Sequence, residues 1–339
     1  MALDVPASSS DADRRLKADT EERVADRSPM AAEAGGTSER AARRGSNTRI
    51  VTPTVSVPQR MREIWLSREL LIYLVRTEIK VKYKNSVLGL IWSMVAPAMT
   101  LAIYYVVFQL ILGNKMPDFV IFLFAGLLLW NLFQLGVLTG TGVVVNNAGI
   151  VKKVSFPREI LALAAVGSAC VFFFFQTIVM IIFMIVLHTV PDMAYFPVLL
   201  LALVAGIVLA CAIAVLLSAI NVYLRDTQHL IEVLLTAWFW ACPIVYPYQQ
   251  QIGDKLGHVW IYFLNPMVPL VLTFQRCIYA RPTAVATTKT GPVVYHVLPD
   301  KGMLWYGGLD LAVLVIGVVL FLVALAVFGR LEGNFAEEL

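Results

Sequence analysis

Six long apolar runs, separated by short polar segments, dominate the chain between residues 88 and 328. A helix needs roughly 20 mostly apolar residues to cross the hydrocarbon core of a bilayer, and the runs approach or exceed that length. The first four contain no Asp, Glu, Lys, Arg or His. The pattern predicts an all-α integral membrane protein with six transmembrane helices. The predicted spans are residues 88–112, 119–140, 161–187, 196–221, 230–244 with flanking residues, and 304–328.

Composition agrees with this pattern. The chain is 59% hydrophobic and 15% charged, whereas soluble globular domains are about 25% charged. The formal net charge of +4 is unevenly distributed, because 16 of the 27 Lys and Arg residues lie within residues 1–86, ahead of the first span. We interpret this asymmetry as a topology signal and not as a nucleic-acid-binding surface.

Basic residues in short loops predict the orientation of the spans, because such loops stay on the cytoplasmic side. The loops on the opposite side, between the first and second spans and between the third and fourth, contain a single Lys or Arg residue, Lys115. Both termini are therefore expected in the cytoplasm, with the chain as a multi-pass protein of the cytoplasmic (inner) membrane. The basic residues expected on the cytoplasmic side of the spans are Lys152, Lys153, Arg158, Arg225 and Arg330.

The N-terminal part divides into two segments. Residues 1–58 are polar and lack an apolar run, which predicts a disordered cytoplasmic tail. Residues 59–86 predict an amphipathic helix along the inner membrane surface, with the six-span domain following at 87–339. Anchoring to lipid and docking of a partner protein both remain open for this helix. Its apolar face has Ile64, Leu71, Val75 and Ile79, and its polar face Arg62, Glu69, Arg76, Lys80 and Lys84.

The segment between the fifth and sixth spans, residues 245–303, is expected to face the outer side of the membrane and to form a gate. Within it, residues 256–264 and 267–279 are apolar but too short to span. Asn265, Pro266 and Pro269 interrupt them, so we expect short re-entrant helices.

The chain lacks the residues of several competing mechanisms. An ion-driven carrier usually has ionisable groups inside its spans, but only Glu232 and Asp310 are candidates, and both lie near span ends. A membrane glycosyltransferase would need an acidic cluster. No GxxxxGK[ST] phosphate loop is present. ATP-driven transport would therefore require a separate ATPase subunit.

Four stretches resemble the permeases of type-2 ABC exporters for O-antigen, teichoic acid and related polysaccharides. The resemblance covers about residues 61–335. It departs from the family at Glu78, where an Asp is expected. The stretches read RTEIKVKYKNSVLGLIWSMVAP (76–97), NAGIVKKVSFPREIL (147–161), NVYLRDTQHL (221–230) and WACPIVYP (240–247). The interface-helix residues it indicates are Arg76, Glu78, Lys80, Tyr83 and Lys84.

This resemblance implies a coupling helix near residues 147–160 that contacts an ATP-binding subunit. Two copies of that subunit and a homodimer of this chain are expected, with a polyprenyl-linked polysaccharide as substrate and membrane lipids around it. No nucleic acid, metal or catalytic residue is expected here, and ATP and Mg²⁺ would belong to the partner subunit. The coupling residues are Lys152, Lys153, Val154, Phe156, Pro157, Arg158 and Glu159.

Aromatic residues are candidates for the translocation path, because sugar rings stack on aromatic faces. Packing and membrane-interface belts explain many aromatics equally well. The path candidates are Tyr104, Phe108, Phe133, Trp238 and Trp240.

Arg225 and Asp226 are expected to form an ion pair that fixes a cytoplasmic turn.

The KKVSFPREIL and WFWACPIVYP stretches resemble the actinobacterial branch that exports the lipid-linked galactan precursor of arabinogalactan. Export of O-antigen or teichoic acid is the alternative.

Overall fold

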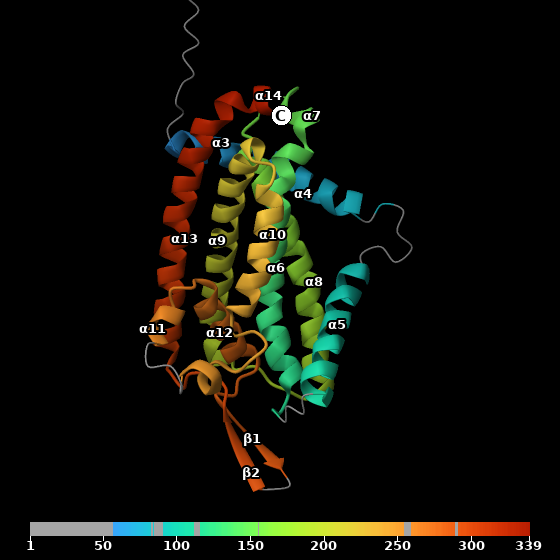
Figure 1. Cartoon of the computed structure of the whole chain (residues 1–339), viewed down its shortest axis with the longest axis vertical. Coiled ribbons are helices and arrows are strands. Elements are labelled where there is room, and N and C mark those ends of the chain that lie inside the picture. Colours follow the sequence, from blue (N-terminus) through green and yellow to red (C-terminus); the bar gives the residue numbers. More distant parts are fainter. Residues whose placement is uncertain are drawn as a thin grey trace, which may run out of the picture. The chain divides into compact units, whose positions relative to one another are not determined.

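Four long helices form the frame of the protein, as Figure 1 illustrates. The computed structural model describes residues 57–82, 84, 91–111, 116–154, 156–253, 259–288 and 291–339, all within one compact unit, residues 54–339. Each long helix is long and apolar enough to cross a membrane. The helices are α6 (Phe119–Asn146), α8 (Glu159–Val186), α9 (Phe196–Tyr223) and α13 (Met303–Leu331). The sequence prediction of a helix in each of these four runs is confirmed.

The first apolar run is helical wherever the structure describes it, and the fifth forms a shorter helix than predicted. Helix α5 (Trp92–Tyr105) continues into the π-helix η2 (Val106–Ile111), and the remainder of the predicted 88–112 span lies outside the described residues. Helix α10 (Thr227–Trp240) has 14 residues and ends before Pro243, which lies in a turn. Its rise is about 21 Å, less than the roughly 30 Å of a hydrocarbon core. The predicted 230–244 span is therefore wrong at its C-terminal end, and six full spans are not established.

Helix α6 lies at the centre and is buried along most of its length. It packs against α8, α9 and α10, while α13 packs along the far side of α9 (Figure 1). Close approach of α6 and α9 depends on a glycine, because a Cβ at Gly140 would lie 2.6 Å from the Cβ of Ala214. Small residues at helix contacts are typical of bundles in membranes.

The region predicted to be re-entrant contains two short helices in its described part. Helix α12 (Met267–Ile278) is buried except at Arg276 and packs against α6 and α9. Helix α11 (Val259–Tyr262) precedes it. The Gln275 Nε2 atom donates a hydrogen bond of 2.9 Å to the carbonyl of Pro243. Non-helical backbone at membrane depth needs such partners, because no water is available in lipid.

Two features differ from the sequence predictions. The segment after α12 forms an antiparallel hairpin of β1 (Thr283–Thr288) and β2 (Gly291–His296), which the sequence analysis does not predict. The interface helix is divided at Ser67 into α3 (Val57–Leu66) and α4 (Arg68–Lys82). We call the end of the bundle with α3 and α7 (Ala148–Val151) the α7 end, and the opposite end the hairpin end (Figure 1). The remaining short elements are η3 (Met193–Tyr195), η4 (Gln249–Gly253), η5 (Glu332–Asn334) and α14 (Phe335–Glu338).

Candidate functional site

The predicted coupling segment forms an exposed loop at the α7 end. Helix α7 is a single turn, and α8 begins at Glu159, two residues after Pro157. Lys152 and Lys153 are exposed, and Val154 is 54% exposed. Phe156 is half-buried against the core. The loop thus presents two cations and one apolar side chain on its outer surface.

Four charged residues form a cluster beneath this loop, which we call the ionic joint: Arg60, Arg158, Glu159 and Glu332. Arg60 of α3 pairs with Glu159, whose side chain is fully buried. Its Nη1 also lies 2.9 Å from Oε2 of Glu332. Arg158 Nε lies 3.6 Å from Oε1 of Glu332, and Arg158 Nη1 donates to the Glu332 carbonyl at 3.0 Å. The two cations and two anions balance formally.

Helix α13 and the residues after it fit closely around the joint. A Cβ at Gly329 would lie 2.7 Å from Nε of Arg60, so this position leaves space for the guanidinium. Phe335 is fully buried and packs against Phe328, with ring centroids 5.4 Å apart. The Tyr223 hydroxyl donates to the Leu331 carbonyl at 2.7 Å. The joint therefore connects α3, the loop before α8 and the end of α13.

This geometry separates the predicted coupling residues into two groups. Lys152, Lys153 and Val154 face outward, whereas Arg158 and Glu159 point into the protein and hold the loop in place. Sequence reasoning missed Arg60 and Glu332, which lie 99 and 173 positions from Glu159 along the chain. One signal was available, because a carboxylate at the start of a long apolar run needs a buried counterion.

The predicted interface-helix residues also divide. Arg76, Lys80 and Lys84 are exposed, as their polar face predicts. Glu78 instead turns toward α8, where the Ser168 hydroxyl donates to its carboxylate. Tyr83 lies outside the described residues. Helix α4 therefore packs against the bundle as well as presenting a basic surface.

Aromatic rings from α5, η2, α6 and α10 form a continuous group, which we call the aromatic wall: Tyr104, Phe108, Trp130, Phe133, Trp238, Phe239 and Trp240. Phe239 of α10 stacks on Tyr104 of α5, with centroids 6.3 Å apart. Phe133 of α6 meets Trp238 edge to face at 5.3 Å. The wall contains all five predicted path residues. Sequence reasoning missed Trp130 and Phe239, which connect the others.

The rings of the wall differ in exposure. Phe133 is fully buried, whereas Trp240 is 53% exposed. Trp238 is fixed by Asn265, whose Oδ1 accepts a hydrogen bond of 2.8 Å from the indole nitrogen. The same Oδ1 accepts from the backbone nitrogen of Met267, and Asn265 Nδ2 donates to the Ala241 carbonyl. One amide therefore joins the end of α10 to the start of α12.

The turn after α9 is present, but its predicted ion pair is wrong. Arg225 and Asp226 are both exposed, and no ion pair between them occurs in the described structure. Backbone hydrogen bonds hold the turn, from Leu224 to Ile220 and from Thr227 to Leu224. Charged side chains at an aqueous surface gain little from pairing, which explains why the turn does not depend on them.

Comparisons with known proteins give the family. The ABC-2 type transporter family matches residues 69–278. The O-antigen export system permease protein RfbA of Myxococcus xanthus is 30% identical over 281 residues, covering 82% of this chain and 98% of the relative. Two proteins of the same name from Klebsiella pneumoniae are 25% and 26% identical over 271 residues, covering 80% of this chain and 95% of each relative. The chain belongs to the ABC-2 type transporter family and is a multi-pass membrane permease.

Proposed function

We propose that this chain is the membrane subunit of an ATP-driven exporter that moves a polyprenyl-diphosphate-linked polysaccharide across the cytoplasmic membrane. The observation that carries the proposal is the exposed loop at the α7 end, held by the ionic joint, in a chain of the ABC-2 type family. The relatives' role in O-antigen export supports a polysaccharide substrate. ATP and Mg²⁺ belong to the ATP-binding subunit, and this chain is not itself an enzyme.

The ATP-binding subunit docks on the α7 end. Lys152 and Lys153 offer positive charge, and Val154 offers an apolar contact. Because Arg158 and Glu159 connect this loop to α3 and α13, a displacement of the loop is passed to both helices. The α7 end faces the cytoplasm in this proposal, with both termini there, since the basic loops lie at that end.

The translocation path follows the aromatic wall between two copies of this chain. Helix α10 supports a second copy, because it leaves an apolar stripe exposed at Leu230, Val233, Leu234 and Trp240. Two copies facing each other would enclose a wider passage than the interior of a single helix bundle could. Stacking on several rings gives weak, repeated contacts suited to a sliding polymer.

The galactan precursor of arabinogalactan is the proposed substrate, with O-antigen or teichoic acid as the alternative. The support is the resemblance of the loop and α10 stretches to the actinobacterial branch. Inverted membrane vesicles that carry each purified lipid-linked glycan in their outer leaflet distinguish these substrates. ATP-dependent uptake of galactan alone supports the first, and uptake of another glycan alone replaces it.

Copurification tests the exporter proposal. The tagged chain, isolated from its native membrane in mild detergent, is expected to bring an ATP-hydrolysing subunit with it. Val154→Asp should lower recovery of that subunit about tenfold, because a carboxylate at an apolar contact is buried without a partner. Val154→Thr, which is similar in shape and uncharged, is the matched control. Absence of any ATPase with the wild-type chain overturns the proposal, whereas normal recovery with Val154→Asp removes only the loop's docking role.

A further inference from the structure

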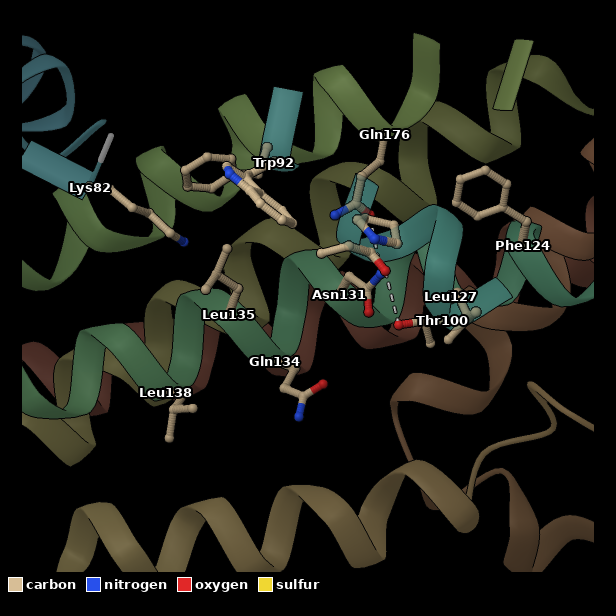
Figure 2. A pocket seen from close by; sticks show the side chains of 13 residues that line it. Lys82, Trp92, Thr100, Phe124, Leu127, Asn131, Gln134, Leu135, Leu138 and Gln176 are labelled. Atoms are coloured by element: carbon tan, nitrogen blue, oxygen red, sulfur yellow. Dashed lines mark hydrogen bonds between the residues drawn. The ribbon is translucent and has the colours of Figure 1, made fainter. Parts of the chain in front are cut away.

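A cavity of about 580 Å³ lies between α5, α6 and α8, beside the end of α4 (Figure 2). Its volume is within the roughly 300–1,000 Å³ typical of ligand pockets. One face of α6 lines it from Phe124 to Leu138. These residues are 14 positions apart, which corresponds to about 21 Å along the helix. The cavity is therefore elongated along the bundle axis.

Two amide side chains face each other at the middle of this cavity (Figure 2). Asn131 Nδ2 donates a hydrogen bond of 3.2 Å to Oε1 of Gln176. Gln176 is only 8% exposed. Within the described part of the chain, this bond joins the two amides, and neither Asn131 Oδ1 nor Gln176 Nε2 is among the fully buried atoms that lack a partner. One acceptor and one amide nitrogen thus remain available toward the cavity.

Amide groups that line a cavity within a helix bundle are available to a polar ligand. Polar side chains within transmembrane helices are rare and usually mark a substrate pathway. A sugar hydroxyl both donates and accepts hydrogen bonds, so it matches an amide pair with one free acceptor and one free donor. Trp92 and Phe172 also line the cavity and offer apolar ring surfaces.

One end of the cavity is cationic. Lys82 lies there, with Nζ 4.3 Å from the centroid of the Phe172 ring (Figure 2). Burial lowers the pKa of Lys82, and the nearby Glu78 opposes that shift. An ammonium group at the mouth of a largely apolar cavity is suited to a phosphate oxygen. The order along the axis is therefore cation, aromatic rings, then amides.

We propose that this cavity binds the head of a prenyl-diphosphate glycolipid, with phosphate at Lys82 and the first sugars at Asn131 and Gln176. This inference rests on the proposed function and adds a binding site for its substrate. All residues of the proposed site belong to one copy of the chain. The prenyl tail would remain outside the cavity, in the surrounding lipid.

Binding to the full-length chain in nanodiscs, together with its ATP-binding subunit, tests the site. The probes are a prenyl-diphosphate disaccharide, the same prenyl diphosphate without sugar, the free disaccharide, and phosphatidylglycerol. Gln176→Leu should weaken the glycosylated probe about tenfold and leave the sugar-free lipid unchanged, because only sugar contacts are lost. Lys82→Met should weaken both prenyl diphosphates by a similar factor. Thr177→Val on the same helix is the matched control, because Thr177 bonds its own backbone and does not line the cavity.

A second measurement uses the wild-type chain and therefore does not depend on whether the variants fold. A photoreactive group on the first sugar is expected to label peptides around Asn131 and Gln176. Labelling confined to other helices, or unchanged binding by both Gln176→Leu and Lys82→Met, overturns the site while wild-type binding and export stand. Equal affinity for phosphatidylglycerol assigns the cavity to ordinary lipid and also overturns it. If the wild-type complex neither binds the glycosylated probe nor hydrolyses ATP faster in its presence, the proposed function itself fails.

Discussion

The ionic joint and the cavity that contains Asn131 and Gln176 both place polar side chains within the bundle. The side chains of the two regions differ in how much of their hydrogen-bonding capacity they use. In the joint, Arg60 contacts both Glu159 and Glu332, and Arg158 contacts the second of these. In the cavity, Asn131 and Gln176 share a single hydrogen bond, and the rest of their capacity faces open space. The first arrangement suits a mechanical connection, and the second suits binding.

Stability measurements can test this difference, because truncation in the joint leaves a buried charge without its counterion, whereas truncation in the cavity removes a single neutral hydrogen bond. Asn265 offers an intermediate case within the same bundle. Its amide makes four contacts, with Trp238, Met267, Ala241 and Cys242. We therefore expect the largest loss at the joint, a moderate loss at Asn265 and almost none in the cavity.

The largest effect is expected for Arg60→Met. Removing this guanidinium leaves the buried Glu159 carboxylate without its counterion, which costs about 3 kcal/mol or more in unfolding free energy. The apparent melting temperature in detergent should fall by about 5 °C or more, as measured by scanning fluorimetry.

The double variant Arg60→Met with Glu159→Met is the control for this prediction. It removes both members of the pair and leaves Arg158 with Glu332, so most of the lost stability should return. A double variant as unstable as the single one would show that Arg60 acts through packing, and the joint would lose its electrostatic basis.

A moderate effect is expected for Asn265→Leu. The change removes partners from the Trp238 indole and from the start of α12, at a cost of about 1–3 kcal/mol. Thermal unfolding measures the loss, and a shift in tryptophan fluorescence should accompany it. Asn265→Asp retains the shared acceptor and should lose less. Wild-type stability of Asn265→Leu would contradict the assignment of this amide to the α10–α12 connection.

The smallest effect is expected for Gln176→Leu. It removes one hydrogen bond but also a polar group from an apolar span, so the stability should change by less than about 0.5 kcal/mol. The same thermal assay applies, with Thr177→Val as the neighbouring control. A loss comparable to that of Asn265→Leu would make the Asn131–Gln176 pair structural, and the cavity would then not differ from the joint in this respect.

The long helices could be predicted from sequence because their signal is local. Each of α6, α8, α9 and α13 corresponds to a long run of high mean hydropathy. The end of α10 could not be placed in this way, since the apolar residues continue beyond Trp240 while the backbone turns before Pro243. The hairpin was missed although β-branched residues in 283–296 gave a signal for strands.

The candidate sites depend on contacts between distant parts of the chain, and this limited their prediction. The loop at 147–160 was found by its resemblance to a family, but Arg60 and Glu332 belong to no motif that points to it. Asn131 and Gln176 were overlooked because a lone amide in an apolar run has no sequence partner. They lie 45 positions apart and meet only through the packing of α6 and α8.

The shortness of α10 has a consequence for the thickness of the barrier. Its 14 residues rise about 21 Å, so about a third of a hydrocarbon core of roughly 30 Å is left without this helix. From the hairpin end, that remaining depth is occupied by α12 and by polar side chains such as Asn265. Water that reached this depth from the hairpin end would reduce the thickness of the low-dielectric layer that a hydrated polymer has to cross. Passage would then require dehydration over about two-thirds of the membrane.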